Sequence, residues 1–278
     1  MKKGLPVIFL ILCGLAFMGF KVRLDHIPRS RVFGSSIIYL PRGTFLKPAT
    51  LGFSSLAADL VYLWAIQYYS TPEITDRFEY LDHIFSIIFE LDPRSLDPYE
   101  TGAIISVYEA ENIDLALQML EKGYANNPDQ WLFPFQAGHY AQYFLKDFER
   151  AKRYYGQAAA IEGAPAQTKR LYANALFETT DYQTSWLVWQ EVYETAEDAR
   201  TRKIAENHLY RVKSAVDIEI IKEALLTYKN RYGHFPDEMD RLVQSGLLAS
   251  VPPDFDGKDY RYDPLTGDVG TQAQWMKR

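Results

Sequence analysis

Three aspartates near the C-terminus are the residues best suited to chemistry. Asp254, Asp256 and Asp259 lie within the six residues DFDGKD. Calcium prefers carboxylate oxygens as ligands, so this cluster predicts a calcium site. The glycine is spaced differently from that of an EF-hand loop, and an Asp-Gly turn explains the same residues. Calcium is the one cofactor that the sequence suggests, and the turn is its alternative.

No other part of the sequence has the motifs of a reactive site. The histidines are scattered, and neither HExxH nor a paired metal-ligand spacing occurs; they are His26, His83, His139, His208 and His234. Walker, GxSxG and dinucleotide-binding motifs do not occur either. Without a catalytic set, we expect a protein that is not an enzyme and has no small-molecule substrate.

Charge and cysteine content exclude further classes. The net charge is -6 and the pI about 5.5, so the basic face that nucleic-acid binding requires is not expected. Cys13 is the single cysteine. An intramolecular disulfide and a thiolate zinc site are therefore excluded.

An uncharged apolar run near the N-terminus predicts a membrane segment. Leu5–Phe20 follows Lys2 and Lys3 and precedes Lys21 and Arg23. As a helix, these residues would extend roughly 24 Å, less than the bilayer core of about 30 Å. Basic side chains at both ends can extend the span by snorkelling. We expect a retained single-pass anchor; a cleaved signal peptide and a buried helix are the alternatives.

The flanking charges leave the orientation of this segment open. Lys2 and Lys3 favour a cytoplasmic N-terminus, whereas Arg29 and Arg31 follow the run and favour the opposite. A lysine-led apolar start is the commoner export pattern. We expect a bacterial inner-membrane protein whose soluble part is periplasmic.

Three later segments repeat with a period near 34 residues. Each has a turn, then a bulky residue, then a small residue three places further on. The pairs are Ile113 and Ala116, Phe148 and Ala151, and Tyr182 and Ser185. The small residues are 35 and 34 positions apart, and a small side chain allows two antiparallel helices to approach closely. These segments predict stacked helix pairs.

The same residues resemble the tetratricopeptide repeat (TPR) over about residues 97–198. The segment KDFERAKRYYGQAAAIEG is the closest match. Gly138 and His139 depart from the family's Leu-Gly pair, and Ser185 stands where alanine is expected. A fourth, degenerate unit is predicted from Leu51–Ser70 and Thr75–Pro93. The resemblance implies a mainly α fold, a TPR-like α-solenoid of helix pairs.

The resemblance also implies a groove that binds a protein partner. First-helix positions that would face it are Ile105, Tyr108, Gln136, Tyr140, Tyr143, Phe144, Arg170, Asn174 and Phe177. Tyrosine, phenylalanine and arginine bury large areas at interfaces. Packing between helices is the alternative role of Tyr143 and Phe144.

The C-terminal part differs in character from the repeats. Glu197–Tyr232 predicts helix, in two pieces, with an apolar stripe able to cap the last repeat. A short helix from Pro236 and two strands, near Tyr260–Tyr262 and Val269, follow. Asp263–Gly267 predicts the turn between the strands. This gives a small C-terminal α+β hairpin module.

The module resembles the globular tail of type II secretion pseudopilins. The resemblance is carried by Tyr232, Gly233, Pro236, Leu242, Gly246, Leu247, Leu248, Pro252, Gly257, Tyr260, Tyr262, Pro264 and Gly267. The pseudopilin N-terminus, with its prepilin cleavage site, is missing. The resemblance implies docking on a secretion apparatus, or a module that stiffens the preceding helix.

These patterns give one predicted organisation. A membrane anchor or signal at 1–24 is followed by an extended linker at 25–50, TPR-like repeats at 51–198, a capping helix at 199–232 and the pseudopilin-tail-like module at 233–278. We expect a protein–protein interaction scaffold in the cell envelope that presents a TPR groove. The alternative is a structural or accessory subunit of a pilus or secretion-type assembly.

Overall fold

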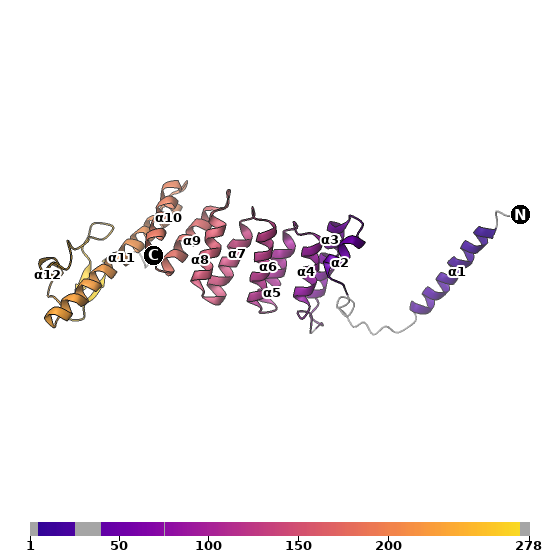
Figure 1. The fold of residues 1–278 in the computed structure, drawn as a ribbon, viewed down its shortest axis with the longest axis horizontal. Helices are drawn as coiled ribbons and strands as arrows, with labels where there is room; N and C mark the ends of the chain where they lie inside the picture. The colour runs from indigo at the N-terminus through magenta and orange to yellow at the C-terminus, as the bar shows by residue number, and fades with distance from the viewer. Residues whose placement is uncertain (1–4, 26–39, 75, 273–278) are drawn as a thin grey trace. The chain divides into compact units, whose positions relative to one another are not determined.

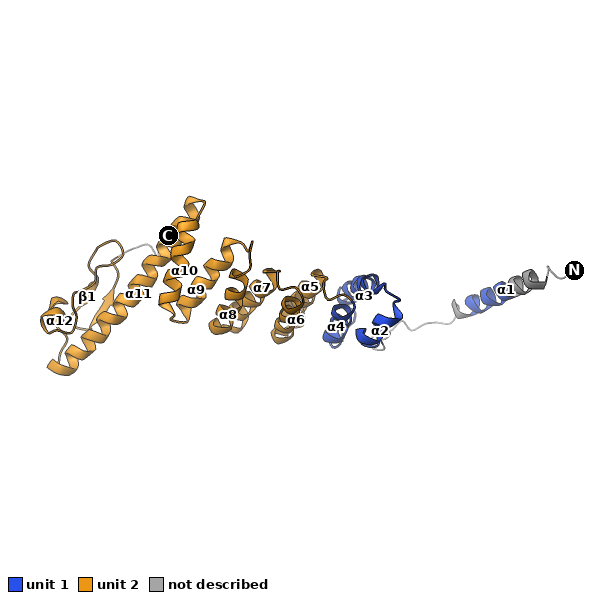
Figure 2. Cartoon of the chain, turned by 45° about the horizontal axis from the view of Figure 1, so that its top comes forward, with its two compact units in different colours: residues 1–91 blue, residues 92–278 orange. Residues whose placement is uncertain are grey.

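The fold is mainly α-helical, as the sequence predicts. The computed structural model describes residues 5–25, 40–74 and 76–272, and for residues 5–12 and 24–25 it describes the backbone alone (Figure 1). The flanking residues Lys2 and Lys3 and most of the predicted linker lie outside these ranges. The described chain forms two compact units, residues 1–91 and 92–278 (Figure 2). The single repeat region predicted at 51–198 is therefore divided after Leu91.

The first unit contains helices α1 (Leu5–Asp25), α2 (Gly43–Ala49), α3 (Ser54–Tyr69) and α4 (Leu81–Leu91). Helices α2 and α3 both pack on α4. Within the described part of the chain, no helix combines the length and apolar composition that crossing a bilayer requires.

Helix α2 corrects the prediction of an extended linker over 25–50. Gly43 starts the helix against α4, where an added Cβ would stand 2.8 Å from the Ile87 carbonyl oxygen. The Glu90 carboxylate accepts a hydrogen bond of 2.7 Å from the Thr44 amide, which satisfies one of the free donors at the helix start. Contacts with α4 therefore stabilise a helix that the local sequence does not indicate.

The second helix of the degenerate unit is shorter than predicted. Thr75–Pro93 was expected to be helical, but α4 covers only Leu81–Leu91, and residues 76–80 form turns. The partner helix predicted at Leu51–Ser70 is confirmed as α3.

The second unit begins with a series of helices in which each packs on the next. They are α5 (Asp97–Tyr108), α6 (Ile113–Asn126), α7 (Leu132–Tyr140) with the π-helix η1 (Ala141–Leu145), α8 (Phe148–Ala159), α9 (Ala166–Glu178), α10 (Tyr182–Thr195) and α11 (Ala199–Tyr232). Their connections are short, so neighbours run antiparallel. The predicted helix pairs are confirmed.

The turns within three of the pairs share one construction. Glu111, Lys146 and Thr180 adopt positive φ values of 52°, 56° and 60°. The next residue then caps the following helix. The capping bonds join Asn112 Oδ1 to the Leu115 amide, Asp147 Oδ1 to the Arg150 amide and Asp181 Oδ1 to the Thr184 amide. Such caps satisfy free amides at a helix start and fix where α6, α8 and α10 begin.

The small repeat residues occupy the helix contacts. Ala116, Ala151 and Ser185 are fully buried. Ser185 keeps its hydroxyl satisfied by donating a hydrogen bond of 2.8 Å to the carbonyl oxygen of Ala173 on α9. A serine is therefore compatible with a position where the repeat pattern favours alanine.

Helix α11 is continuous, so the prediction of two helical pieces is wrong. Its first half packs Leu209 and Val212 against Trp189 of α10. Its second half packs Ile221 and Leu225 against the C-terminal module. The predicted cap on the last pair is present. Spacing of three or four residues placed Ile220 on the expected stripe with Leu209 and Val212, but Ile220 is exposed and its neighbour Ile221 is buried instead. The stripe therefore does not run the whole length of α11.

The C-terminal module matches its predicted elements. Helix α12 (Asp240–Gln244) precedes strands β1 (Arg261–Asp263) and β2 (Asp268–Gly270). The strands pair antiparallel, with Tyr262 opposite Val269. Within the described residues, these two strands form the only sheet. Leu242, Tyr260 and Val269 form its core with the second half of α11.

Candidate interaction surface

Three aromatic rings from α5, α7 and η1 form a cluster, which we call the aromatic cluster. The centroid of the Tyr108 ring lies 5.7 Å from that of Phe144 and 6.5 Å from that of Tyr140. The centroids of Tyr140 and Phe144 are 5.9 Å apart. All three pairs meet edge to face, a favourable geometry for aromatic rings. The structure thus brings together residues that the sequence predicted for the groove.

The three rings differ in exposure. Tyr140 is only 4% exposed, which places it in the core and not on the predicted binding face. Tyr108 is 61% exposed and Phe144 42%. Tyr143, also from η1, is half exposed. Packing between helices, the alternative considered for Tyr143 and Phe144, therefore leaves much of both rings in solvent.

The π-helix η1 gives this surface its shape. It occupies Ala141–Leu145 and ends at Lys146, in the left-handed conformation. π-helical turns are rare and occur often at functional sites. Leu145 on η1 and Ile104 on α5 are also exposed. Leu145 was not predicted because no local pattern indicates a π-turn, and Ile104 was not among the expected groove positions. Ile104, Tyr108, Tyr143, Phe144 and Leu145 together are called the aromatic surface below.

Burial shifts the pKa values of two side chains in or next to the aromatic cluster. Burial, with smaller contributions from Tyr108 and Glu100, raises the pKa of Tyr140 to about 12. Burial also lowers the pKa of His139, whose ring lies 4.3 Å from that of Tyr143. The raised pKa keeps Tyr140 uncharged at neutral pH.

Gln136 lies on the same helix, α7, and is half-buried. Its amide oxygen is buried without a hydrogen-bond donor among the described residues. Leaving a buried acceptor unsatisfied costs about 1–3 kcal/mol. Such a sacrifice of stability is more typical of functional positions than of a repeat core.

The remaining predicted groove residues have other surroundings. Ile105, Arg170, Asn174 and Phe177 are half-buried. The Phe177 ring packs on Tyr182, and the guanidinium of Arg211 lies 4.0 Å from the ring centroid. Phe177 therefore belongs to the packing of α9, α10 and α11.

A second concave surface lies between α10 and α11. It is an open groove of about 450 Å³ lined by Tyr182, Gln183, Trp186, Leu187, Val212, Lys213, Val216 and Asp217. Leu187 is exposed on its wall. The Trp186 ring packs edge to face on Phe255 of the C-terminal module, 6.2 Å away. This groove was not predicted, because one of its walls is α11, which lies outside the repeat pattern.

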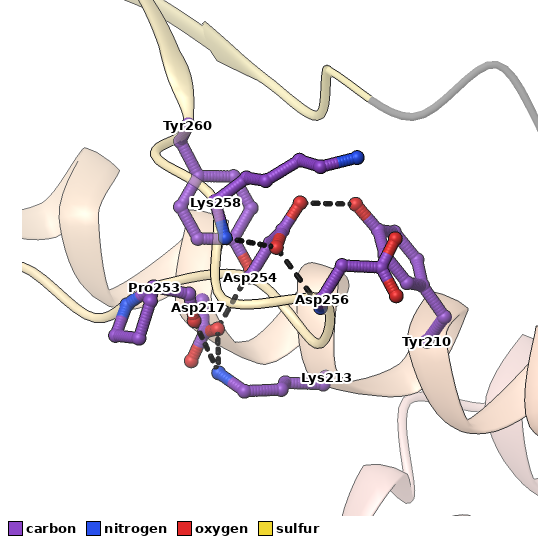
Figure 3. A network of polar contacts seen from close by, with 8 residues as sticks. All are labelled: Tyr210, Lys213, Asp217, Pro253, Asp254, Asp256, Lys258 and Tyr260. Atoms are coloured by element: carbon purple, nitrogen blue, oxygen red, sulfur yellow. Dashed lines mark hydrogen bonds and ion pairs between the residues drawn. The ribbon is translucent and has the colours of Figure 1, made fainter.

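The acidic loop at 254–259 is bound to α11 (Figure 3). Asp254 is buried, and its Oδ2 accepts a hydrogen bond of 2.6 Å from the Tyr210 hydroxyl. Its Oδ1 accepts from the amides of Asp256 and Lys258 at 3.0 and 2.7 Å. Burial alone would raise the pKa of Asp254, but these hydrogen bonds outweigh it and hold the pKa below its usual value.

A second contact joins the same loop to α11. Asp217 is buried and accepts a hydrogen bond of 2.7 Å from the Tyr260 hydroxyl. Lys213 pairs with Asp217 and also donates to the carbonyl oxygen of Pro253, at 2.7 Å (Figure 3). These bonds use the two carboxylates to hold the module on the helix.

These contacts bear on the calcium prediction. Both oxygens of Asp254 already accept hydrogen bonds from the protein, which favours the turn interpretation, whereas Asp256 and Asp259 are exposed. In the described ranges, no three His, Cys, Asp or Glu side chains are grouped so as to hold a metal ion. Calcium binding at this loop stays a prediction.

One histidine has a well-defined environment of its own. His208 on α11 stacks on Trp189, with ring centroids 4.0 Å apart and an interplanar angle of 4°. Burial, together with the charges of Arg211 and Arg170, lowers the pKa of His208 to about 4. His208 is therefore neutral at pH 7 and contributes to packing.

No model of a protein family matches this chain, and no curated protein matches it in sequence.

Proposed function

We propose that the chain is a membrane-anchored, non-enzymatic scaffold that binds a protein partner through the aromatic surface. The observation that carries this proposal is the exposure of Tyr108 and Phe144, whose rings both meet the buried Tyr140 ring, with the exposed Tyr143 next to Phe144 in η1. Isolated exposed apolar side chains need no explanation, but several gathered on adjoining elements are typical of binding sites. Tyr108 lies on α5, and Tyr143 and Phe144 lie on η1, which follows α7.

The chemistry of the aromatic surface indicates which kind of protein segment it would bind. Rings with few rotatable bonds lose little entropy on binding and favour aliphatic or aromatic anchor residues. Lys146 lies 6.0 Å from the centroid of the Tyr143 ring and places one positive charge at the edge. The partner is therefore expected to be a protein segment with two or three apolar anchors and an acidic flank.

Attachment to the membrane is supported by the sequence. The apolar run Leu5–Phe20 with basic flanks is the basis for a single-pass anchor in a bacterial inner membrane. Export of the soluble part to the periplasm follows from the lysine-led start. Neither a nucleic acid nor a small-molecule substrate is part of this proposal.

The test compares two pairs of substitutions in the native host. Tyr108→Ser with Phe144→Ser removes both exposed rings of the aromatic cluster. Tyr193→Ser with Leu226→Ser is the control, because these residues are also exposed and apolar but lie on α10 and α11, away from the aromatic surface and from the groove between those helices. Cross-linking in intact membranes, followed by mass spectrometry, compares the proteins that each variant captures.

We expect the first variant to lose a captured protein that the wild-type chain and the control variant retain. Equal capture by both variants would rule out the aromatic surface as the binding site. Circular dichroism of each variant shows whether its helices remain folded.

A second candidate function is an accessory subunit of a pilus or secretion assembly. The observation in its favour is the 34-residue helix α11 carrying a small hairpin module at its end. Leu265 at the hairpin turn is 91% exposed. This candidate predicts that Leu265→Lys disrupts co-purification with secretion subunits while the aromatic variants leave it intact.

A further inference from the structure

The first unit carries exposed apolar side chains on α2, on α3 and on the turn between them. They are Phe45, Leu51, Phe53, Leu56, Leu60 and Leu63, and we call them the α2–α3 apolar surface. Each is more than half exposed. Leu56, Leu60 and Leu63 recur at intervals of four and three residues, so they lie along one face of α3, and Phe53 is the residue that precedes the helix.

The opposite face of α3 is already used for folding. Ala58, Ala65, Tyr68 and Tyr69 are buried, and the Tyr69 ring stacks on Phe85 of α4. The exposed stripe is therefore not the face by which α3 packs on α4. Asp59 is the only charged residue of α3, and it lies at the edge of the stripe. A helix that is apolar on all sides is normally covered by protein or lipid.

Two basic residues lie on the α2 part of this surface, beside the carboxylate of Glu90 on α4. Residues 40–58 contain Arg42 and Lys47 and no acidic residue. Arg42 is exposed at the start of α2. Lys47 donates to the carbonyl oxygen of Glu90, 3.4 Å away, and is exposed. Exposed phenylalanine and leucine side chains combined with basic residues are the pattern of segments that lie in the interface of a bilayer.

The chain itself limits how far this surface can be from the anchor. Residues 26–42 connect α1 to α2. Fully extended, this connection reaches at most about 60 Å. If Leu5–Phe20 spans the membrane, the first unit stays within that distance of the lipid. A second copy of the chain has no comparable tether to this face.

We propose that the α2–α3 apolar surface lies in the headgroup and upper acyl region of the bilayer, so that the first unit rests on the membrane beside the anchor. This inference rests on the proposed anchor for its tether. The occupant is lipid with anionic headgroups, which would contact Arg42 while the leucines of α3 enter the acyl boundary.

The experiment places an environment-sensitive fluorophore at single sites of the full chain. In a Cys13→Ser background, cysteine replaces Leu60 on the proposed surface, Phe17 in the anchor, or Glu79 as an exposed polar control in the same unit. Each is labelled with NBD (nitrobenzoxadiazole) and reconstituted in vesicles of phosphatidylcholine and phosphatidylglycerol. Quenching by nitroxide-labelled lipid is compared with quenching by aqueous iodide.

The expected result is lipid quenching at positions 17 and 60, at least threefold stronger than at position 79, with iodide quenching only at 79. Quenching of the label at position 60 by nitroxide-labelled lipid should weaken when phosphatidylglycerol is omitted or when Arg42→Gln is added. Iodide quenching at 60 together with lipid quenching at 17 would overturn the inference and leave the anchor standing.

Two other outcomes separate the two proposals further. Lipid quenching at position 60 without lipid quenching at position 17 would support contact between the α2–α3 apolar surface and the bilayer, and it would contradict the proposed transmembrane anchor. Protection of position 60 from both quenchers means that protein covers the surface, which overturns the inference in favour of a second copy of the chain.

Discussion

The Tyr155 ring lies directly against the backbone of Gly138, so closely that an added Cβ would stand 2.6 Å from a ring carbon. This contact joins α7 to α8 at the position where the repeat pattern departs from the TPR family. A glycine there lets a tyrosine fill the space between the helices.

Gly138→Ala is therefore expected to destabilise the second unit. Tyr155 is fully buried and cannot move aside freely, and overpacking of this kind costs about 1–3 kcal/mol. Urea unfolding measures the effect. In a Tyr155→Leu background the same substitution should cost less; an equal loss in both backgrounds would contradict the close contact.

Thr180→Gly is expected to stabilise the protein. Thr180 has φ of 60°, and a β-branched residue is strained in the left-handed region. Glycine adopts this conformation at helix ends without strain, so a gain of about 1 kcal/mol is expected. Gln118→Gly, at an exposed helical position, should instead lose about 1 kcal/mol. A fall in stability for Thr180→Gly would be inconsistent with the described turn.

The stability of the protein is expected to fall between pH 7.5 and pH 5 because of His208. Its pKa is lowered to about 4 in the folded chain, compared with about 6.5 when unfolded. Protons therefore bind the unfolded state first. The stabilising contribution is complete above about pH 6.5 and is lost as the pH falls toward the folded pKa. At pH 5 the loss is on the order of 1–2 kcal/mol.

His208→Phe keeps a ring stacked on Trp189 but removes the titrating group. We expect this variant to lose less stability than the wild type between pH 7.5 and pH 5 in urea unfolding. Arg170 and Arg211 face His208 in both proteins, so their charges cancel in the comparison. Parallel losses would show that other groups cause the pH dependence.

Asp254→Asn is expected to destabilise the C-terminal module in the presence of EDTA. The substitution weakens the charge-assisted bonds from Tyr210 and from two amides, and a loss of about 1–3 kcal/mol follows. If calcium is the main role of this loop, the variant should instead match the wild type in EDTA and differ only after calcium is added. Thermal unfolding under both conditions distinguishes the two roles.

Features of the fold that depend on neighbouring residues could be predicted from the sequence. The turns at Asn112, Asp147 and Asp181 were predictable because a capping side chain acts within its own helix start. The β-hairpin was predictable for the same reason, since Asp263–Gly267 is a local turn. Helix α2 was missed because its stability comes from Glu90 on α4, distant in the sequence.

The candidate surface was predicted in part. The TPR resemblance placed Tyr108 and Phe144 on the expected groove, and the structure brings their rings together. Tyr140 was misassigned because spacing alone does not tell the core side of a helix from its rim. The π-turn Ala141–Leu145 was not predicted, because no local pattern in the sequence indicates one.

Helix α11 has a mechanical consequence. Its backbone hydrogen bonds continue from Ala199 to Tyr232, and its two halves belong to two different cores. A continuous helix of about 51 Å whose two ends are packed into different cores transmits force between them. A partner that pulls or twists the hairpin would load the contact between α10 and α11 directly, with no flexible joint to absorb the strain.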